Sequence, residues 1–372
     1  MPILQKLLRA ALLIPALLLL HACDDSSSSN RRVYDWSALS TTLDSVLGSG
    51  AGQVSGYSFE LIDREGSLFA KAGGNIASDD LVILASATKL PSVMAILTLV
   101  DSGELALDTP VATYLAADPG FVWPADKAAI TMRMLLAHTS GLPGLDDSSQ
   151  PACINNETGI SLRNCAQNIA NTALVDTPGA AFNYGGIDFQ IAAYIATLIS
   201  GKNWQDFFQT RLGAPLGLSR FTYGDPATVI NPRAAGGGFS TATEYSAFLS
   251  LLLNDGQHGN TRVLSSAMVS EILSDQVAGL PTRYTPFPPL RALAYPGYGL
   301  GVFVSAPRLH PGSDGPEWSD PGLFGSMPWI DLSLGYGGVL LIISADTVTG
   351  LDIWNDLRPD IITQLTSPAP TP

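Results

Sequence analysis

The sequence predicts an α+β fold in which one antiparallel sheet collects strands from both ends of the chain and is flanked by helices. Two observations predict it. An alternating apolar pattern occurs near the amino terminus, strand-like runs return after residue 297, and the long stretch between them has helical periodicity. We therefore expect a mostly helical subdomain inserted between the first and last strands. With 46% hydrophobic and 14% charged residues, the chain is too apolar to be disordered.

The individual elements follow from local patterns. Helical spacing predicts helices at 37–47, 87–102, 131–137, 187–199, 204–212 and 352–365, the last interrupted near Pro359. Thr241 with Glu244 three residues later predicts a capping box at one more helix start. Alternation predicts a β-hairpin at 57–72 with its turn at 63–66, and strand-like runs predict strands at 298–305, 323–330 and 338–343. The Pro-rich segment 276–296 is expected to be a loop that borders a site.

The first 22 residues resemble a signal peptide: Lys6 and Arg9 precede a short apolar run and a small-residue cleavage site before Cys23. A cysteine there is similar to a bacterial lipobox, which implies a lipid anchor on Cys23 and a place at the periplasmic face of a bacterial membrane. The alternative is an uncleaved membrane helix, but ten or so apolar residues fall short of the ~20 needed to span. Residues 23–32 then form a lipidated tether, 33–366 the folded domain and 367–372 a disordered tail.

The formal net charge of −14 disfavours nucleic acid as a partner, because an acidic surface repels phosphate backbones. Cys153 and Cys165 lie twelve positions apart in a polar stretch of an exported chain, where a disulfide is the simplest expectation. A metal pair is the competing interpretation. It is disfavoured because the four histidines are scattered without ligand spacing, so we expect no metal and no cofactor.

Ser86 and Lys89 stand three residues apart at the start of an apolar helix, which places them on one helical face. The helix start offers backbone N–H groups to an oxyanion. Lys89 is one of only five lysines, and its apolar surroundings predict a lowered pKa for its ammonium group. The alternative is an N-cap serine followed by a solvated lysine.

Longer motifs decide between these two interpretations. The chain resembles the serine β-lactamase and penicillin-binding-protein superfamily, in the branch of class C β-lactamases and family VIII carboxylesterases. The matching stretches are Ser-Ala-Thr-Lys at 86–89, Leu-Leu-Ala-His-Thr-Ser-Gly-Leu-Pro-Gly at 135–144, Pro-Gly-Ala-Ala-Phe-Asn-Tyr at 178–184 and Gly-Gly-Gly-Phe-Ser-Thr-Ala at 236–242. The resemblance covers about residues 35–350 and implies a β-lactamase/transpeptidase-like fold.

The resemblance also implies roles for single residues. Ser86 is the expected nucleophile, and Lys89 and Tyr184 are the expected proton carriers. A neutral Lys89, or Tyr184 with a pKa lowered by Lys89, accepts the serine proton, and the sequence leaves both open. The N–H groups of Ser86 and Leu323 are the expected oxyanion donors, with Gly322 allowing a strand to approach closely. His138 is expected to be a structural turn residue.

Two departures from the family pattern bear on the substrate. The second motif reads Tyr184-Gly185-Gly186 and lacks the usual asparagine amide, and the third motif has Asp320 in place of a cation. We expect Asp320 to repel anionic substrates. The sequence therefore predicts a serine carboxylesterase that acts on small uncharged esters. The alternatives are a β-lactamase or D-amino-acid peptidase, and a non-catalytic binding lipoprotein that keeps the fold.

Overall fold

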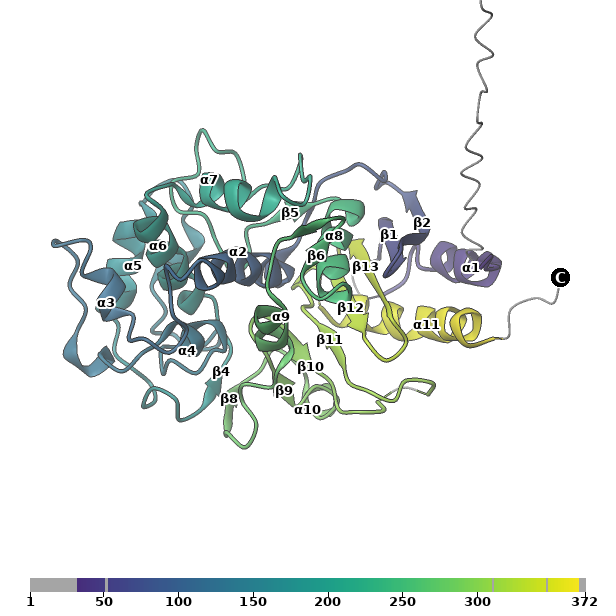
Figure 1. Ribbon diagram of the computed structural model, residues 1–372. Helices are drawn as coiled ribbons and strands as arrows, with labels where there is room; N and C mark the ends of the chain where they lie inside the picture. Colours follow the sequence, from purple (N-terminus) through teal and green to yellow (C-terminus); the bar gives the residue numbers. More distant parts are fainter. Residues whose placement is uncertain (1–31, 51–52, 310, 346, 368–372) are drawn as a thin grey trace, which may run out of the picture. The chain divides into compact units, whose positions relative to one another are not determined.

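The chain folds around a seven-stranded antiparallel sheet whose strands come from both ends of the domain (Figure 1). The strand order is β2-β1-β13-β12-β11-β10-β9, with bounds Gly66–Gly74, Gly56–Asp63, Tyr336–Ile342, Met327–Asp331, Glu317–Ser319, Phe303–Val304 and Gly297–Tyr298. The first strand, β1, pairs with the last strand, β13, in a register that places Phe59 opposite Leu340. This pairing of the two ends confirms the predicted α+β fold class.

This computed structural model describes residues 32–50, 53–309, 311–345 and 347–367, and its main unit spans Asp35–Pro368. The predicted signal peptide, Cys23 and nearly all of the tether lie outside the described residues, as does the predicted tail after residue 367. Within the described part of the chain, no helix has both the length and the apolar character that crossing a bilayer requires.

Helices cover both faces of the sheet, and the alternation of side chains along β13 shows why. Val339 and Leu341 join the core under helix α8 (Ala242–Leu253), whereas Leu340 and Ile342 point to the opposite face. There they pack with α1 (Ser37–Ser45) and α11 (Thr347–Thr366). Both faces of β13 are buried, which explains its run of apolar residues.

The helical subdomain lies between β2 and β9 in sequence. Its helices are α2 (Lys89–Asp101), α3 (Ala112–Leu115), α4 (Met132–Leu136), α5 (Leu162–Ala170), α6 (Ile187–Ser200), α7 (Trp204–Phe208), α9 (Ser266–Leu273) and α10 (Pro289–Ala292). Short 3₁₀ turns η1 (Ala85–Thr88), η2 (Ala125–Lys127) and η3 (Ala152–Asn155) and the π-helical η4 (Gln209–Gly213) connect them. Its short strand pairs are Val82–Ile83 with Phe239–Ser240 (β3, β5), Phe182–Asn183 with Thr282–Tyr284 (β4, β8), and Gln257–His258 with Thr261–Arg262 (β6, β7).

Helix α2 is the central helix of this part. Its residues are buried on every side from Lys89 to Leu99, as expected for a helix that is apolar all round. It contacts α6, α7 and α9. A lysine at its first position is therefore enclosed by protein, which sets the chemistry described below.

Several predicted strand boundaries are wrong. The predicted strand 298–305 is a pair of two-residue strands, β9 and β10, because Gly301 has a φ of 77° and turns the chain between them. The predicted strand 323–330 begins only at Met327. Gly325 has a φ of 92°, a conformation that continues a turn and not a strand, so Leu323 lies in the turn between β11 and β12.

The helix predictions differ in detail. The last helix, α11, starts before the predicted position and continues through Pro359 without interruption. The predicted helix 204–212 is α7 followed by η4. At the start of α8, the Thr241 hydroxyl accepts a hydrogen bond from the Glu244 N–H, as predicted. The Glu244 carboxylate, however, accepts hydrogen bonds from the backbone of residues 219–221, so only half of the capping box forms.

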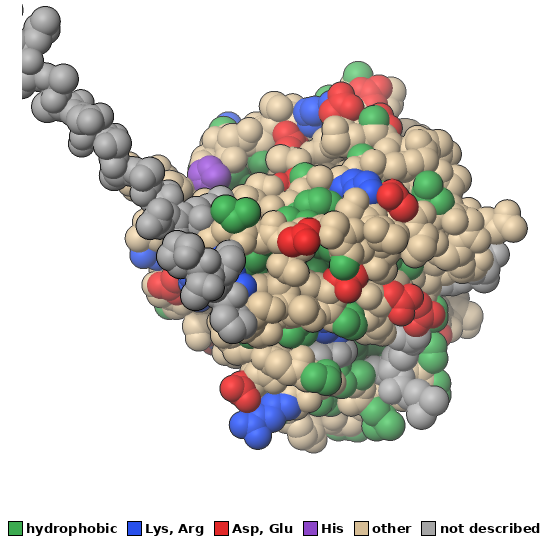
Figure 2. Space-filling model, turned by 90° about the vertical axis from the view of Figure 1, so that its right-hand side faces the viewer, with side chains coloured by type: hydrophobic (Ala, Val, Ile, Leu, Met, Phe, Trp, Pro, Cys, Tyr) green, Lys and Arg blue, Asp and Glu red, His purple; other side chains and the backbone are tan. Residues whose placement is uncertain are grey.

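The acidic residues do not gather into one patch on the face that Figure 2 shows. Asp and Glu side chains are dispersed there among polar and apolar ones, with Lys and Arg between them. This face lies on the side of α1 and α11 in Figure 1.

Candidate active site

Ser86 lies at the point where the chain leaves β3 and begins helix α2. It belongs to the 3₁₀ turn η1, and Ala85 directly before it has a φ of 47°, a left-handed conformation that non-glycine residues seldom adopt. Such backbone strain is common at functional sites. Lys89 is the first residue of α2, one turn after the serine, and its Nζ lies 3.0 Å from Ser86 Oγ.

Tyr184 reaches the same point from the segment between β4 and α6. Its hydroxyl lies 2.9 Å from Lys89 Nζ, which also donates to the carbonyl oxygen of Ala235 at 3.0 Å. Lys89 is 2% exposed and Tyr184 is 1% exposed, whereas Ser86 is half-buried and open to the cavity. The structure thus brings together the three residues predicted to be catalytic, with the amine between the two hydroxyl groups.

Burial shifts the pKa values of Lys89 and Tyr184 in opposite directions, and this distinguishes the two residues as candidate bases. It lowers the pKa of the Lys89 ammonium to about 8, although the negative charge of Asp320 opposes the shift. It raises the pKa of Tyr184 well above its ordinary value, and Asp320 raises it further. The expectation that Lys89 lowers the pKa of Tyr184 is therefore wrong, because the cost of burying a phenolate is larger. Neutral Lys89 is the more accessible base near neutral pH.

Asp320 does not occupy the position that the sequence suggested. It is 1% exposed, its Oδ2 accepts a hydrogen bond from the Leu90 N–H at 3.0 Å, and it is not among the residues that line the catalytic cavity. Burial raises its pKa to about 8, while nearby Lys89 acts in the opposite direction. The prediction that Asp320 repels anionic substrates is wrong in its premise, since the carboxylate faces the start of α2 and not the cavity.

Gly322 and Leu323 lie in a turn and not on the predicted strand, and Leu323 belongs to the cavity lining. The Gly322 N–H donates to the Ser326 carbonyl at 2.7 Å. A Cβ atom on Gly322 would lie 2.1 Å from the Leu84 carbonyl oxygen, two residues before Ser86, so this position requires glycine. Leu323 follows directly, lines the cavity and is 54% exposed. The turn therefore runs close to the nucleophile, as the predicted oxyanion site requires.

These residues enclose a cavity of about 280 Å³. The cavity is lined by Ala85, Ser86, Lys89, Leu145, Gln150, Pro151, Ala152, Ile154, Asn155, Tyr184, Gly185, Gly186, Gln190, Arg233, Ala235, Gly236, Pro286, Phe287, Pro321 and Leu323. Pro286 and Phe287 come from the Pro-rich segment predicted to border a site. Two larger cavities, of about 600 and 630 Å³, contain none of the three residues predicted to be catalytic.

His138 packs behind Tyr184 and does not line the cavity. Its ring centroid lies 4.8 Å from that of Tyr184, and its Nδ1 lies 3.2 Å from Asp188 Oδ2. Burial lowers the pKa of the imidazole, against the opposing effect of Asp188. With a φ of 56° the residue also makes the turn after α4. Its position suits a residue that supports the tyrosine and not one that contacts a substrate.

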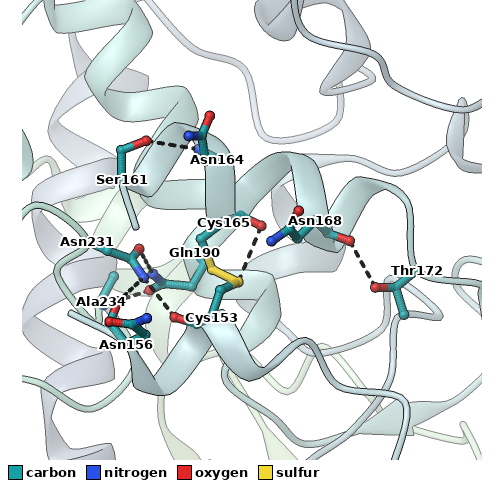
Figure 3. The surroundings of a disulfide bond; sticks show 10 residues. All are labelled: Cys153, Asn156, Ser161, Asn164, Cys165, Asn168, Thr172, Gln190, Asn231 and Ala234. Carbon is teal, nitrogen blue, oxygen red and sulfur yellow. Dashed lines mark hydrogen bonds between the residues drawn. A yellow bond between two sulfur atoms is a disulfide. The ribbon is translucent and has the colours of Figure 1, made fainter. Parts of the chain in front are cut away.

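Cys153 and Cys165 meet beside the cavity (Figure 3). Their sulfur atoms are 2.04 Å apart, and the bond joins η3 to α5. Ala152, Ile154 and Asn155 of η3 belong to the cavity wall, so the bond lies directly behind that wall. The described residues contain no cluster of three or more His, Cys, Asp or Glu side chains arranged to hold a metal ion.

Comparison with known proteins places this geometry in a family. The family model described as Beta-lactamase matches residues 43–358. The chain belongs to the β-lactamase family. This is a family of serine hydrolases, and the proteins similar to this member include penicillin-binding proteins as well as esterases.

Two curated relatives illustrate the range. Penicillin-binding protein 4 of Amycolatopsis lactamdurans is 30% identical over 246 residues, which are 58% of this β-lactamase-family chain and 61% of that protein. Esterase EstB of Burkholderia gladioli is 26% identical over 257 residues, 66% of this chain and 58% of that protein. The matches thus span about three fifths of either relative. A crystal structure of a β-lactamase candidate from Bacteroides dorei DSM 17855 covers 90% of this chain and 100% of its own, with a TM-score of 0.73 and 25% identity.

Sequence reasoning missed three groups of this β-lactamase-family site: the Ala235 carbonyl, Gln190 and Arg233. A backbone carbonyl leaves no sequence signal. Arg233 did leave a sequence signal, because it is a cation shortly before the Gly-rich run 236–238 that matches the family. Cys23 lies outside the described residues.

Proposed function

We propose that the protein is a carboxylesterase that forms an acyl-enzyme on Ser86. The observation that carries the proposal is the position of Lys89 Nζ, 3.0 Å from Ser86 Oγ and 2.9 Å from Tyr184 OH, at the wall of the cavity. A serine hydroxyl becomes a useful nucleophile when a base removes its proton. A lysine with a pKa of about 8 holds about a tenth of its population as the neutral amine at pH 7, far more than an ordinary lysine does.

The proposed reaction has two halves. Lys89 takes the Ser86 proton while Oγ attacks the ester carbonyl carbon, and the N–H groups of Ser86 and Leu323 donate to the oxyanion. The C–O bond to the alcohol then breaks. Tyr184 passes its proton to the departing alkoxide and regains one from the Lys89 ammonium, so the alcohol leaves neutral. In the second half, water gives a proton to Lys89 and its oxygen attacks the acyl carbon. The bond between that carbon and Ser86 Oγ then breaks, Oγ takes the proton back from the Lys89 ammonium, and the carboxylic acid is released.

The second-motif region favours an ester over a β-lactam. Gly185 and Gly186 bring no side chain to the position where lactam-binding relatives are expected to hold an amide. The side-chain amide of Gln190 lines the cavity, but its Nε2 donates to Asn231 Oδ1 and its Oε1 accepts from the Ala234 N–H. Both ends of that amide are occupied within the protein. Similarity to esterase EstB supports the same choice.

Hydrolysis of 4-nitrophenyl acetate and butyrate tests the proposal. Ser86→Ala should lower kcat/KM by about 10⁴-fold or more, whereas Ser45→Ala, on an exposed face of α1, should leave it unchanged. An unchanged rate in Ser86→Ala overturns the proposal. Nitrocefin and a D-alanyl-D-alanine peptide are the competing substrates, and a higher kcat/KM for either would replace the ester assignment.

We also propose that the protein is exported, anchored by a lipid on Cys23 and stabilised by the Cys153–Cys165 disulfide. The bacterial lipobox-like sequence before Cys23 and the placement of Cys153 on η3 beside Cys165 on α5 support this. Cell fractionation of the wild type and of Cys23→Ser is the test. The wild type should sediment with membranes and the variant should not. Equal distribution of both would contradict an anchor at Cys23.

A further inference from the structure

The catalytic cavity carries the opposite charge to the protein as a whole. The chain has a net charge of −14, yet the described residues that line the cavity include two cations, Lys89 and Arg233, and no Asp or Glu. Lys89 is committed to Ser86, Tyr184 and Ala235. Arg233 neither gives nor takes a proton in the proposed reaction, although its positive charge helps to lower the pKa of Lys89. It is therefore the cation available to a bound molecule.

The backbone around Arg233 is held in place by buried hydrogen bonds (Figure 3). Gln190 bonds on both sides of this residue, to the side chain of Asn231, two positions before it, at 2.9 Å and to the N–H of Ala234, directly after it, at 3.0 Å. The Asn231 amide then donates to the carbonyl oxygens of Cys153 and Asn156. Gln190, Asn231 and Ala234 are all at most 2% exposed. Because these hydrogen bonds fix the backbone on both sides of Arg233, less conformational entropy is lost when its side chain binds a ligand.

The same segment connects Arg233 to the nucleophile. Two residues further on, the Ala235 carbonyl accepts from Lys89. A Cβ atom on Gly236 would lie 3.7 Å from Arg233 Nη2 and 3.7 Å from the backbone carbon of Ala85, the residue before Ser86. The guanidinium and the start of η1 thus face each other across a position where glycine leaves space. A substrate whose carbonyl lies at Ser86 has the guanidinium within reach of a nearby substituent.

Within the protein, Arg233 has a weak ionic partner. The described residues provide one ion pair, to Glu157 Oε1 at 3.5 Å, and both side chains are more than one third exposed. An exposed pair at this distance contributes little to stability. The guanidinium has five donors in a planar fork that matches a carboxylate. A substrate carboxylate is therefore able to compete with Glu157 for it.

We propose that Arg233 is a specificity-determining residue that binds a carboxylate substituent of the substrate, so that the preferred esters are anionic. This rests on the proposed esterase function. It replaces the preference for uncharged esters that the sequence suggested through Asp320. The family resemblance implies that relatives carry a cation in the third motif, which corresponds here to residues 319–325. In this chain the cation is Arg233, which comes from an earlier segment, just before the Gly-rich run at 236–238.

The test compares matched pairs of esters. One pair places the charge on the acyl side: 4-nitrophenyl hydrogen succinate and its methyl-capped diester. The other places it on the alcohol side: 3-carboxy-4-nitrophenyl butyrate and its methyl ester. The measured quantity is the ratio of kcat/KM for the anionic ester to that for the neutral ester, taken within each variant. Changes in the shared chemistry at Ser86 cancel in this ratio.

Wild type should prefer the anionic member of at least one pair, and Arg233→Gln should lower that ratio about 10- to 100-fold, as expected for a lost charge-assisted contact. Arg233→Lys should keep part of the preference, mainly through KM. Glu157→Gln should raise the ratio. The matched control is Arg220→Gln, because Arg220 is 45% exposed and also forms a 3.5 Å ion pair, with Asp79, away from the cavity. Its ratio should equal that of the wild type.

The outcomes separate the two proposals. A preference that Arg233→Gln removes and Arg220→Gln keeps supports the role of Arg233, and the pair that shows it identifies the charged half of the substrate. Hydrolysis of neutral esters through Ser86 with no anionic preference, or with equal losses in both variants, overturns the role and leaves the esterase function standing. Absence of hydrolysis of all four esters overturns the esterase function itself.

Discussion

On one side of the cavity, Lys89 and Tyr184 are at most 2% exposed and their polar atoms meet partners at 2.9 to 3.0 Å. At another part of its lining, Leu323 is 54% exposed and lies in a turn that Gly322 brings against Leu84. The first wall works through side chains whose pKa values depend on burial. The second wall offers its backbone, so the identity of its side chains matters less than the path of the chain.

This difference predicts which substitutions should lower the activity most. On the Lys89 wall, any change of a functional group removes a buried proton carrier whose position and pKa depend on that burial. On the turn wall, a change of side chain should be tolerated if the backbone keeps its path. The two predictions that follow test each wall, beginning with the larger effect.

Lys89→Met should lower kcat/KM for 4-nitrophenyl butyrate about 10³-fold, since general-base assistance typically accounts for 10²–10⁴. In the wild type, kcat/KM should rise with pH and level off above a midpoint near 8. Burial lowers the pKa of Lys89 to about 8, and its neutral form is the active base. At pH 6 the rate should be about 100-fold below the plateau. A pH profile of both proteins is the measurement.

Tyr184→Phe provides the control for the identity of the base. If Lys89 is the base, this variant should be slower but keep a midpoint within about one pH unit of 8. The pKa of Tyr184 itself is raised well above its ordinary value, so a wild-type profile that keeps rising beyond pH 10 would assign the base to Tyr184 and contradict the account.

On the turn wall, Gly322→Ala and Leu323→Ala form a contrasting pair. The new methyl group at 322 would meet the Leu84 carbonyl at 2.1 Å, so the turn must move and the oxyanion site with it. We expect a loss of about 10-fold or more in kcat/KM and about 1–3 kcal/mol in stability. Leu323→Ala should change kcat/KM less than about threefold, because its side chain is largely exposed and its N–H remains. Ester kinetics and thermal melts check both, and a larger loss for Leu323→Ala would contradict a wall that acts through its backbone.

The sequence was informative where pattern and chemistry coincide. The sheet joining β1 to β13 follows from alternation near the amino terminus and strand-like apolar runs near the carboxyl terminus. The roles of Ser86, Lys89 and Tyr184 follow from the motifs that resemble the β-lactamase and penicillin-binding-protein superfamily. The lowered pKa of Lys89 also follows, because α2 is apolar all round and its first residue is therefore enclosed.

The sequence predictions that were wrong or missed, for Asp320, Tyr184 and Arg233, share a cause: each depends on how loops pack in the folded chain. Asp320 has the charge that suggested repulsion, but the turn after β11 directs it to the N–H of Leu90 at the start of α2. Burial is the largest cause of the raised pKa of Tyr184, and only the packed structure gives the degree of burial. Arg233 is 144 residues from Lys89 in sequence, and a hydrogen-bond network centred on Gln190 places it at the cavity.

The central claim is that Ser86 is an activated nucleophile. Incubation with a fluorophosphonate probe followed by peptide mapping by mass spectrometry tests it directly, because covalent labelling requires a serine whose proton is removed by a nearby base. The account predicts one label per chain, on Ser86, at a rate that falls in Lys89→Met and with no label in Ser86→Ala. An unlabelled, folded wild-type protein, or a label on another serine, would contradict it.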